Sequence, residues 1–396
     1  MSKLDELIAE LCPDGVELVP LEEVILSLNT GLNPRQFFRL NTVDAKNYYV
    51  TIRELRNNKV IFTDKTDRIN DEALKLCNNR SNLEVGDVLF SGTGTIGETA
   101  VIESPPINWN IKEGVYAIKP DKKRIISRFL MYVLMSQRVR ERYLVKALGG
   151  TVKSVSMGEM KKLLIPIPPL AVQQEIVRIL DNFTELTAEL TAELTARRKQ
   201  YEYYRDFLLT FGDEVEWTTL GEVAINLDSK RKPVAKGKRK AGEYPYYGAS
   251  GIVDYVDDYI FDGDYLLVSE DGANLVARVT PIAFSASGKI WVNNHAHVLE
   301  FETYEDRKFI EYYLNMIDLS RFLSTAAQPK LTQENLNKIP VPAPSFEEKE
   351  RIVAILDRFD ALCNDLTSGI PAEIEARQKQ YEYYRDKLLS FKEVTA

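Results

Sequence analysis

The octapeptide KQYEYYRD occurs twice in this chain, at 199–206 and at 379–386, and both copies continue into similar tails, FLLTF and KLLSF. A second related pair lies upstream, IPIPPLAVQQEIVRILDNF at 165–183 and IPVPAPSFEEKERIVAILDRF at 339–359. Chance does not explain this much repetition. The chain is therefore an internal duplication, and each half must fold into the same kind of unit.

The duplication continues more weakly outside these segments. VELVPLEEV at 16–24 matches VEWTTLGEV at 215–223, and Trp109 and Trp291 each precede related strands. The sequence therefore predicts four parts in the order lobe, helix, lobe, helix. Their boundaries are lobe 1 at 1–163, a first helical segment at 164–211, lobe 2 at 212–338 and a second helical segment at 339–396.

Each lobe reads as a mixture of strands and helices. Short β-branched or aromatic runs such as GVYAI, YLLVS and HVLEF lie between glycine, asparagine and proline residues, which is typical of strands joined by turns. A helix is expected near the end of each lobe, around 127–146 and 306–323. The predicted fold class is α+β, with two pseudo-symmetric mixed lobes separated by two long antiparallel helices.

The helical segments carry apolar residues at three- and four-residue steps, which is the pattern of a stripe along one helix face. We expect the two stripes to bury each other. Ser345 and Glu348 have the spacing of a capping box at a helix start, and Gly369 with Pro371 predicts a break. The stripe residues are Ile176, Leu180, Phe183, Leu186, Leu190 and Leu194 in the first segment, and Ile352, Leu356, Phe359, Leu362, Leu366, Ile370 and Ile374 in the second.

The first helical segment also contains a tandem tetrapeptide, TAELTAEL, at 187–194. Four residues lengthen a helix by about 6 Å and rotate it by about 40° beyond a full turn, so a unit can be added without losing the apolar face. The repeat therefore resembles a length adjustment. The alternative is an ordinary helix rich in alanine and glutamate.

Composition excludes several classes of protein. No apolar run approaches the length of a membrane span, and the acidic N-terminus lacks the basic start of a signal peptide, so we expect a cytoplasmic protein without membrane attachment. The three cysteines are odd in number and widely spaced. They predict neither a disulfide framework nor a zinc site.

The net charge of -8 argues against nucleic-acid binding when it is taken alone. Its distribution argues the other way. Lobe 1 holds 24 basic against 21 acidic residues, whereas lobe 2 holds 14 against 20. Lobe 2 nevertheless contains KRKPVAKGKRK at 230–240, where seven of eleven residues are basic. We call this segment the basic stripe.

Two variable lobes alternating with two similar helical segments resemble the specificity subunit of type I restriction-modification systems. The resemblance covers nearly the whole chain. It is carried by the repeated helical segments described above and by the lobe segments GDVLFSGTGTIG and YPYYGASGIVDYVDDYIFDGDYLLVSEDG. These motifs are specific in combination and weak singly.

The resemblance implies two target recognition domains that each read one half of a split site in double-stranded DNA, and a target whose halves differ. It implies that the helices dock two adenine methyltransferase subunits and, further, motor-nuclease restriction subunits. S-adenosylmethionine, ATP and Mg would then act in those partners. The chain itself would be a recognition subunit that catalyses nothing and binds no cofactor.

In lobe 1 the glycine-rich segment GTGTIG fits the GxGxxG pattern of dinucleotide sites, but the β-branched, proline-broken sequence after it offers no helix to receive a pyrophosphate. A tight loop between strands is the better interpretation. Within the resemblance such a loop approaches DNA, because glycine and threonine permit close backbone contact with phosphate. The candidate DNA contacts of lobe 1 are Gly92, Thr93, Gly94 and Thr95, with Lys153 and Ser154 from the turn before the helix.

In lobe 2 the basic stripe predicts phosphate contact, although a solvated mobile loop is the ordinary role of such a segment. Polar residues nearby are candidates for reading base edges. The loop around Glu270 and Asp271 corresponds to the glycine loop of lobe 1. The candidates are Lys230, Arg231, Lys232, Lys236, Lys238, Arg239 and Lys240 in the stripe, and Tyr246, Tyr247, Ser250, Asn274, Gln328 and Lys330 elsewhere.

The twin YEYYRD segments supply the candidate partner contacts. Tyrosine and arginine are favoured at interface hot spots, and duplication offers two equivalent surfaces to two identical subunits. Packing between the two helices is the alternative. The candidates are Tyr201, Tyr204 and Arg205, and Tyr381, Tyr384 and Arg385.

Signs of catalysis are weak. The sequence has no GxxxxGK[ST], HExxH or GxSxG motif, and its two histidines, His295 and His297, lack an identifiable third ligand for a metal. No metal site is therefore predicted. Two other functions remain open, a nucleotide-dependent enzyme that uses GTGTIG and a coiled-coil scaffold without a DNA role.

Overall fold

The computed structural model describes residues 3–324 and 328–394, and the chain divides into two compact units. Unit 1 is Met1–Glu189 with Ile374–Ala396, and unit 2 is Leu190–Glu373. Each unit therefore combines one lobe with the beginning of one helical segment and the end of the other. The turn that holds the candidates Gln328 and Lys330 has the sequence AAQPKL at 326–331, and its two alanines lie outside the described residues.

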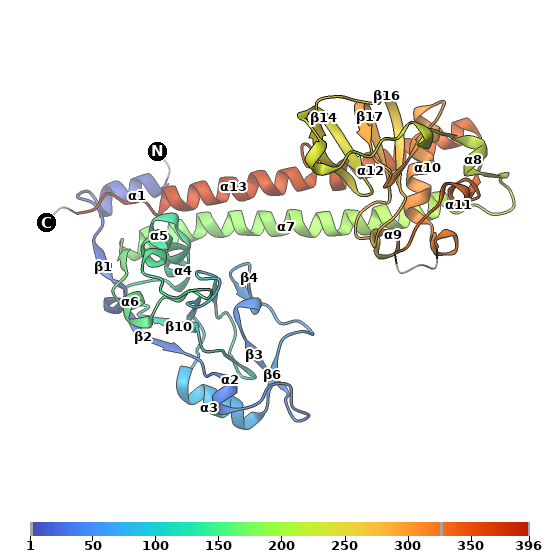
Figure 1. Cartoon of the computed structure of the whole chain (residues 1–396). Helices are drawn as coiled ribbons and strands as arrows, with labels where there is room; N and C mark the ends of the chain where they lie inside the picture. The colour runs from blue at the N-terminus through green and yellow to red at the C-terminus, as the bar shows by residue number, and fades with distance from the viewer. Residues whose placement is uncertain (1–2, 325–327, 395–396) are drawn as a thin grey trace. The chain divides into compact units, whose positions relative to one another are not determined.

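The first helical segment forms one uninterrupted helix, α7, of 40 residues from Leu170 to Leu209 (Figure 1). The second forms two helices, α12 at Phe346–Asn364 and α13 at Ile370–Leu388. Ser345 caps α12 by accepting a hydrogen bond from the Glu348 amide, so the predicted helix start is confirmed, while the Glu348 carboxylate accepts hydrogen bonds from Arg351. The predicted break is confirmed, because α12 ends at Asn364 and α13 begins at Ile370. Glycine is required at 369, where a Cβ would lie 2.5 Å from the Ala361 carbonyl oxygen.

Lobe 1 is built on an antiparallel sheet with the strand order β2-β10-β7-β8 and a second sheet ordered β6-β3-β9. The expected closing helix is in fact two helices, α4 and α5, which meet at Ser136. The elements of unit 1 before α7 are α1 Lys3–Leu11, β1 Leu18–Pro20, β2 Ile25–Thr30, α2 Pro34–Phe37, β3 Asn47–Val50, β4 Leu55–Arg56, β5 Lys59–Val60, β6 Arg68–Ile69, α3 Asp71–Ser81, β7 Val88–Ser91, β8 Thr99–Val101, β9 Trp109–Ile111, β10 Val115–Pro120, α4 Ser127–Met135, α5 Gln137–Val145, α6 Met157–Lys161 and β11 Leu164–Pro166.

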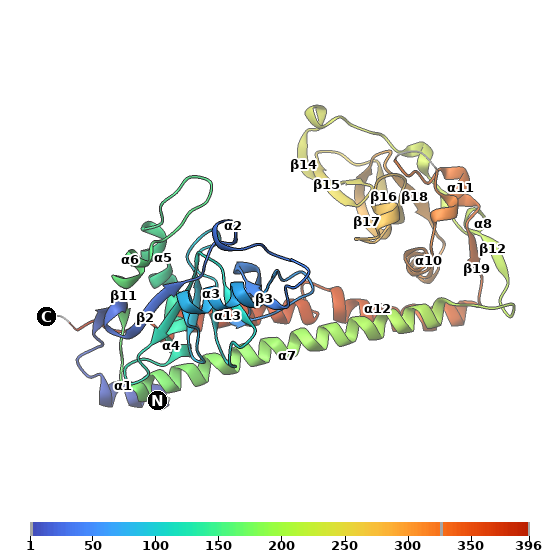
Figure 2. The same ribbon diagram turned by 90° about the horizontal axis from the view of Figure 1, so that it is seen from below.

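Lobe 2 is built on a six-stranded sheet with the order β13-β18-β16-β17-β14-β15, and α10 packs against β16 and β17 (Figure 2). All neighbours in it are antiparallel except β14 and β17. The elements between α7 and α12 are β12 Trp217–Thr219, α8 Leu220–Val223, β13 Ile225–Asn226, β14 Ala241–Gly248, β15 Gly251–Val256, β16 Phe261–Ser269, α9 Asn274–Ala277, β17 Ala283–Val292, β18 Ala296–Glu300, α10 Tyr304–Met316, α11 Gln333–Asn337 and β19 Pro340–Pro342.

The two lobes share internal contacts as well as sequence. In lobe 1, β1 pairs with β11 just before the helix, and β12 pairs with β19 in the same way in lobe 2. Each lobe also has a parallel strand pair at the equivalent place: Trp109 lies opposite Tyr48, and Trp291 lies opposite Tyr246. The duplication inferred from sequence is therefore a duplication of fold.

The starts of the two apolar stripes do not bury each other, and for these residues the expectation was wrong. Ile176 and Leu180 lie in the core of lobe 1 with Phe129, while Ile352 and Leu356 lie in the core of lobe 2 with Phe309. Further along the same stripes Leu186, Leu362 and Leu366 are exposed. The start of each helical segment therefore completes the core of the lobe that precedes it.

Aromatic rings connect the opposing helices within each unit. Phe183 of α7 stacks on Tyr384 of α13 in unit 1, with ring centroids 5.6 Å apart. Phe359 of α12 stacks on Tyr204 of α7 in unit 2, also at 5.6 Å. These phenylalanines and tyrosines occupy equivalent positions of the repeats, so the same contact forms once in each unit.

A buried tyrosine of each lobe is hydrogen-bonded to an aspartate of its helix. The Tyr132 hydroxyl donates to Asp181 at 2.6 Å, and the Tyr312 hydroxyl donates to Asp357 at 2.6 Å. Burial, together with the carboxylate, raises the pKa of both phenols well above the ordinary value. Both hydroxyls therefore stay protonated and remain donors.

We predict that Tyr132→Phe and Tyr312→Phe lower the free energy of unfolding by a similar amount, about 1–3 kcal/mol each, because both remove a bond from a charged acceptor. Urea unfolding of the full chain measures this. Tyr304→Phe is the matched control, since Tyr304 also donates to Asp357 but is 48% exposed. An equal decrease in the control would show that burial does not determine the effect.

Candidate nucleic-acid interface

The structure brings two separate candidate segments of lobe 1 together. Thr93 of the glycine loop forms an isolated β-bridge with Ser154. The Gly94 amide donates to the Lys153 carbonyl at 2.9 Å, and the Val155 amide donates to the Gly92 carbonyl at 2.9 Å. We call the segments 91–97 and 148–155 together loop pair 1.

The glycine loop is a connection between antiparallel strands. It leaves β7 and returns through β8, which pairs with β7 from Val88 to Phe90. No helix follows it, so its amides do not form the helix N-terminus that a dinucleotide pyrophosphate requires. This geometry agrees with the interpretation of GTGTIG as a tight loop.

Lobe 2 repeats the arrangement. Asp271 forms an isolated β-bridge with Lys330. The Gly272 amide donates to the Pro329 carbonyl at 3.3 Å, and the Leu331 amide donates to the Glu270 carbonyl at 2.8 Å. The segments 270–274 and 328–331 form loop pair 2, with the same backbone connections as loop pair 1 and different side chains.

Loop pair 1 borders a polar groove of about 620 Å³. Thr93 and Ser154, both predicted from sequence, contribute to its wall. Three other wall residues, Asn33, Arg80 and Lys112, were not foreseen from the sequence. Arg80 and Lys112 lie far apart in the chain and are exposed, and with Glu113 in the same wall the groove carries two positive charges and one negative charge next to hydroxyl groups. Such a surface suits phosphate and base-edge contacts.

The candidates of lobe 1 differ in exposure. Thr93, Gly94, Thr95 and Lys153 are exposed, and Ser154 is half-buried. Gly92 is buried, and a Cβ there would lie 2.2 Å from the Tyr116 ring. The suggestion that Gly92 permits close approach of DNA is therefore corrected: it makes room for a tyrosine inside the lobe.

The basic stripe separates into two kinds of residue. Its two arginines are not free for DNA. Arg239 pairs with Asp254 at 3.0 Å and lies over the Tyr246 ring, and Arg231 is enclosed by carboxylates. The geometry is therefore compatible with phosphate contact by the lysines and not by the arginines. The five lysines are all exposed: Lys230, Lys232, Lys236, Lys238 and Lys240.

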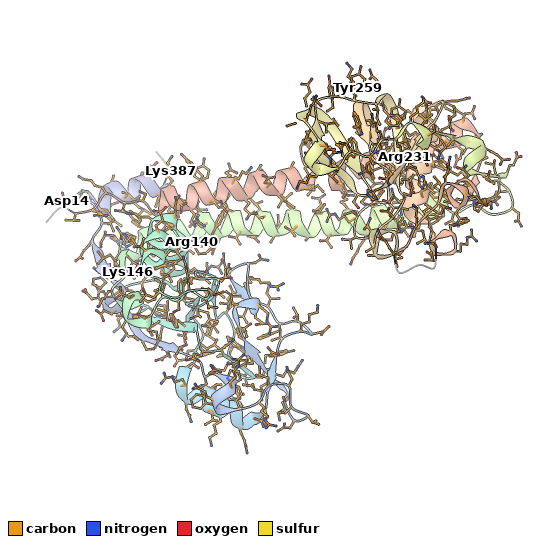
Figure 3. The ribbon with its side chains drawn as sticks, viewed as in Figure 1. Asp14, Arg140, Lys146, Arg231, Tyr259 and Lys387 are labelled. Carbon is orange, nitrogen blue, oxygen red and sulfur yellow. The ribbon has the colours of Figure 1, made fainter. Side chains whose placement is uncertain are left out.

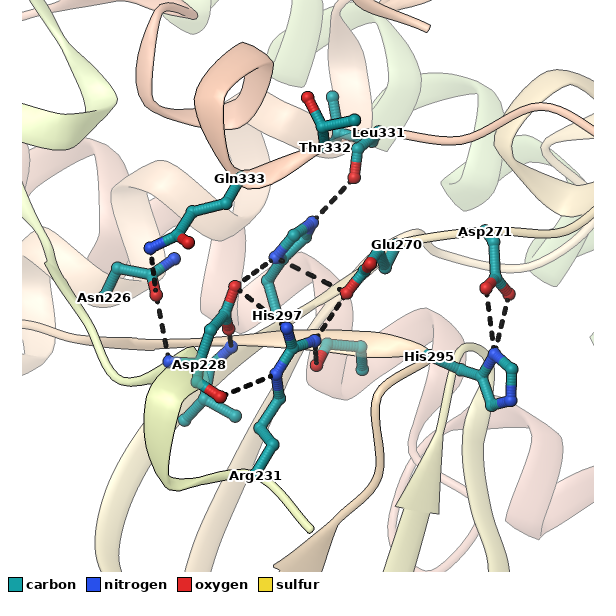
Figure 4. A network of polar contacts seen from close by, with 12 residues as sticks. Asn226, Asp228, Arg231, Glu270, Asp271, His295, His297, Leu331, Thr332 and Gln333 are labelled. Atoms are coloured by element: carbon teal, nitrogen blue, oxygen red, sulfur yellow. Dashed lines mark hydrogen bonds and ion pairs between the residues drawn. The ribbon is translucent and has the colours of Figure 1, made fainter. Parts of the chain in front are cut away.

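Arg231 lies in lobe 2 (Figure 3), where it is the centre of a polar network (Figure 4). Its guanidinium lies 2.5 Å from Glu270 and 3.2 Å from Asp228, and it donates to the Ala296 carbonyl at 2.8 Å. Lys330 adds a contact of 2.9 Å to Glu270. The network ties the basic stripe to loop pair 2.

The carboxylates of this network are held in the charged form. Burial raises the pKa of Asp228, but the hydrogen bond and charge of His297 and the charge of Arg231 lower it more, so the pKa lies below its usual value. Burial likewise raises the pKa of Glu270, while hydrogen bonds from Arg231 and Lys330 bring it below normal. The charges of the Asp228 and Glu270 carboxylates are therefore already balanced by neighbouring positive groups.

The two histidines do not act as a pair. His295 is exposed and contacts Asp271 at 2.9 Å, whereas His297 is buried between Asp228 at 2.6 Å and the Leu331 carbonyl at 2.8 Å (Figure 4). The ligand atoms of Asp228, Glu270 and His297 lie within 4.8 Å of one another. Arg231 and Lys330 already pair with these carboxylates, however, so a metal ion would have to displace them, and we assign none.

The remaining candidates of lobe 2 are scattered. Tyr246 is 1% exposed and accepts a hydrogen bond from the Val234 amide, so its proposed contact with DNA is corrected to a core role. Tyr247 is half-buried and Ser250 is exposed. The Asn274 side chain is bonded to the backbone of Thr280. Gln328 and Lys330 are exposed in loop pair 2.

Of the tyrosines predicted from the twin YEYYRD segments, Tyr204 is 37% exposed, whereas Tyr201, Tyr381 and Tyr384 are half-buried. Tyr201 and Tyr381 pack against the lobe cores, and Arg205 and Arg385 pair with the neighbouring aspartates. The most exposed rings are Tyr203 and Tyr383, at 65% and 61%. Helix periodicity alone did not reveal which tyrosines face outward.

The fold and the two loop pairs define a protein with two equivalent lobes, each joined to helices of the same kind. The family described as the type I restriction modification DNA specificity domain matches residues 13–197 and 212–376. Across residues 3–324 and 328–394, no helix has the length and apolar character needed to cross a membrane.

Individual proteins show the same relationship. The chain is 33% identical over 387 residues to the type I restriction enzyme EcoprrI specificity subunit of Escherichia coli, with 93% of each chain covered. It is 41% identical over 196 residues to a protein of Haemophilus influenzae named as a putative type I restriction enzyme specificity subunit, a match that covers 48% of this chain and 50% of that one. An S subunit structure from M. genitalium superposes with a TM-score of 0.56 over 95% of this chain and 96% of that one, at 19% identity.

The chain therefore belongs to the type I restriction modification DNA specificity family and is a specificity subunit of such a system. The two matched segments correspond to the two halves of the duplication, each a lobe followed by its helical segment.

We predict that Arg231→Ala lowers the free energy of unfolding of unit 2 by about 3–5 kcal/mol, because it takes the main counter-charge from buried Glu270 and a second partner from buried Asp228. Lys236→Ala, an exposed lysine of the same stripe, should change it by less than about 0.5 kcal/mol. Urea unfolding at neutral pH compares the two variants. Similar effects from both would mean that Arg231 is as solvated as the lysines.

The same substitution should alter the response to acid. The folded-state pKa values of Asp228 and Glu270 lie below the ordinary 3.8 and 4.5. Their stabilisation is therefore present above those ordinary values and disappears as the pH falls through the lowered pKa values. Arg231→Ala should flatten the acid limb of a plot of unfolding free energy against pH, since it removes a cause of the lowering.

Proposed function

We propose that this subunit reads a split, asymmetric site in double-stranded DNA, with one loop pair at each half. The observation that supports this most is the repeated backbone geometry of the loop pairs. Each joins a loop between two strands to the turn before the helical segment. Because one framework carries hydroxyl and glycine residues in lobe 1 but charged residues in lobe 2, the two lobes are suited to different base sequences.

Phosphate contacts in lobe 2 are assigned to the lysines of the basic stripe. All five are exposed, and within the described part of the chain their one ion pair is a 3.8 Å contact between Lys240 and Asp257. In lobe 1 the same role is assigned to Lys112 and Arg80 of the groove wall and to Lys153 of loop pair 1. Charges of this kind fix the register of a lobe on the duplex without reading sequence.

We predict that replacing Lys232, Lys236 and Lys238 with glutamine weakens DNA binding by the assembled complex equally on all sequences. The slope of log affinity against log salt should become shallower by about 0.9 for each phosphate that the variant no longer neutralises. Fluorescence anisotropy at several salt concentrations measures it. Lys289→Gln is the control, because Lys289 is an exposed lysine of lobe 2 outside the stripe. An unchanged slope in the triple variant would contradict the assignment.

The helical segments are proposed to set the distance between the two half-sites. The TAEL units lie within the uninterrupted helix α7, at the place where its residues pass from unit 1 to unit 2. Removing one unit shortens the helix by about 6 Å, which corresponds to one or two base pairs of duplex.

We predict that deleting Thr191–Leu194 shortens the nonspecific spacer of the DNA target by one or two base pairs and leaves the two half-site sequences unchanged. Mapping methylated adenines in cells that carry the complete system measures both. The full-length variant Thr191→Ala/Glu193→Gln is the control for altered composition without altered length. A deletion with an unaltered spacer would overturn this role of the helix.

Catalysis is proposed to reside in partners. Two methyltransferase subunits with S-adenosylmethionine, and restriction subunits with ATP and Mg, would assemble on the helical segments in the cytoplasm, and this chain would bind none of these cofactors. The exposed rings of Tyr203 and Tyr383, one from each repeat, replace Tyr201 and Tyr381 as the proposed docking contacts. Their equivalence in the duplication suits two identical subunits.

A further inference from the structure

Two side chains inside the lobes occupy equivalent places behind the loop pairs. Tyr116 of β10 lies opposite Phe90 of β7, and His297 of β18 lies opposite Val268 of β16. Tyr116 is 7% exposed and His297 is fully buried. Phe90 lies two residues before Gly92, and Val268 lies two residues before Glu270. The two lobes therefore align here without a gap in the sequence.

Both side chains bind the same backbone position of the loop pair. The Tyr116 hydroxyl donates to the Val155 carbonyl at 2.6 Å, and Nε2 of His297 lies 2.8 Å from the Leu331 carbonyl. The amides of Val155 and Leu331 donate in turn to the carbonyls of Gly92 and Glu270. Each turn is therefore held by its amide on the first segment and by its carbonyl on the buried side chain.

The residue beside each anchor compensates for its size. Tyr116 fills the space so fully that a Cβ at position 92 would lie 2.2 Å from its ring, so glycine is required there. His297 is smaller and leaves space for the Glu270 side chain, whose Oε2 lies 3.9 Å from the His297 Nδ1. The two lobes thus use tyrosine with glycine, or histidine with glutamate, to hold one backbone geometry.

We propose that Tyr116 and His297 are positioning residues for DNA recognition, and that each is matched to the residue at position 92 or 270. Neither contacts DNA. Each fixes the turn before the helical segment against the loop between the strands, so that groups from both segments face the duplex together. This proposal rests on the proposed function, because the position of the loop pairs matters to recognition only if they approach DNA.

The first test removes one hydroxyl. Tyr116→Phe in the full chain should speed hydrogen exchange in peptides covering 91–97 and 148–156 by about tenfold, because the Val155 carbonyl loses its buried donor. Peptides covering 270–274 and 328–332 should exchange at the original rate. Unchanged exchange in lobe 1 would overturn the anchoring role of Tyr116.

The same variant, assembled with its methyltransferase subunits, separates the two levels of the proposal. Binding should weaken for the half-site read by lobe 1, by about tenfold, which is the effect of one hydrogen bond on an equilibrium. Discrimination at the other half-site should persist. Faster exchange with unaltered DNA binding would leave the anchor in place and overturn the DNA role of loop pair 1.

The second test exchanges the matched pair. His297→Tyr alone should destabilise unit 2, because its ring meets the Glu270 side chain where lobe 1 has glycine. The double variant Glu270→Gly/His297→Tyr should recover thermal stability and slow exchange at 328–332 toward the original rate, while Arg231 keeps its contacts with Asp228 and Ala296. A double variant as damaged as the single one would overturn the matching of the two positions.

Discussion

The core of each lobe is completed by the helix that follows it in the chain. Ile176 and Leu180 of α7 complete the core around Phe129, and Ile352 and Leu356 of α12 complete the core around Phe309. The lobe therefore cannot rotate freely on its own helix without exposing apolar surface, at about 25 cal/mol for each Å². The hydrogen bonds from Tyr132 to Asp181 and from Tyr312 to Asp357 hold the same junction between lobe and helix. Because hydrogen bonds are directional, they also fix the orientation of the lobe on its helix. Because the junction between lobe and helix is fixed, the position of the loops depends on the length of the helix.

The sequence predicted the architecture where a signal was local or repeated. The identical octapeptides revealed the duplication, and Gly369 with Pro371 located the break between α12 and α13. Sequence reasoning failed where the answer depended on a partner far along the chain. Periodicity shows that a helix has an apolar face and does not show what covers it. Leu186 and Leu366 continue the stripes in sequence yet are exposed, because the lobe cores end before them.

The same limit applies to the recognition surface. The glycine loop and the basic stripe were visible in the sequence because their residue types are concentrated. Arg231 and Lys236 look alike in the sequence, but Arg231 is surrounded by Asp228 and Glu270, which come from other elements. Arg80 and Lys112 of the groove were missed because each is an isolated charge until the fold brings it beside Thr93. Residue type thus predicted which segments matter, and long-range contacts decided which side chains remain at the surface.

The two lobes also show how one backbone frame can carry two chemistries. Lobe 1 anchors its turn with a neutral phenol and needs only a glycine beside it. Lobe 2 anchors its turn with an imidazole and places a buried carboxylate beside it, which requires a counter-charge because an unpaired buried charge is costly. Arg231 supplies that charge through its planar, multidentate guanidinium, while the lysines of the same stripe stay in solvent. The basic stripe of lobe 2 therefore contains residues with two different roles. One is a structural arginine that the buried glutamate requires, and the others are lysines that remain in solvent beside it.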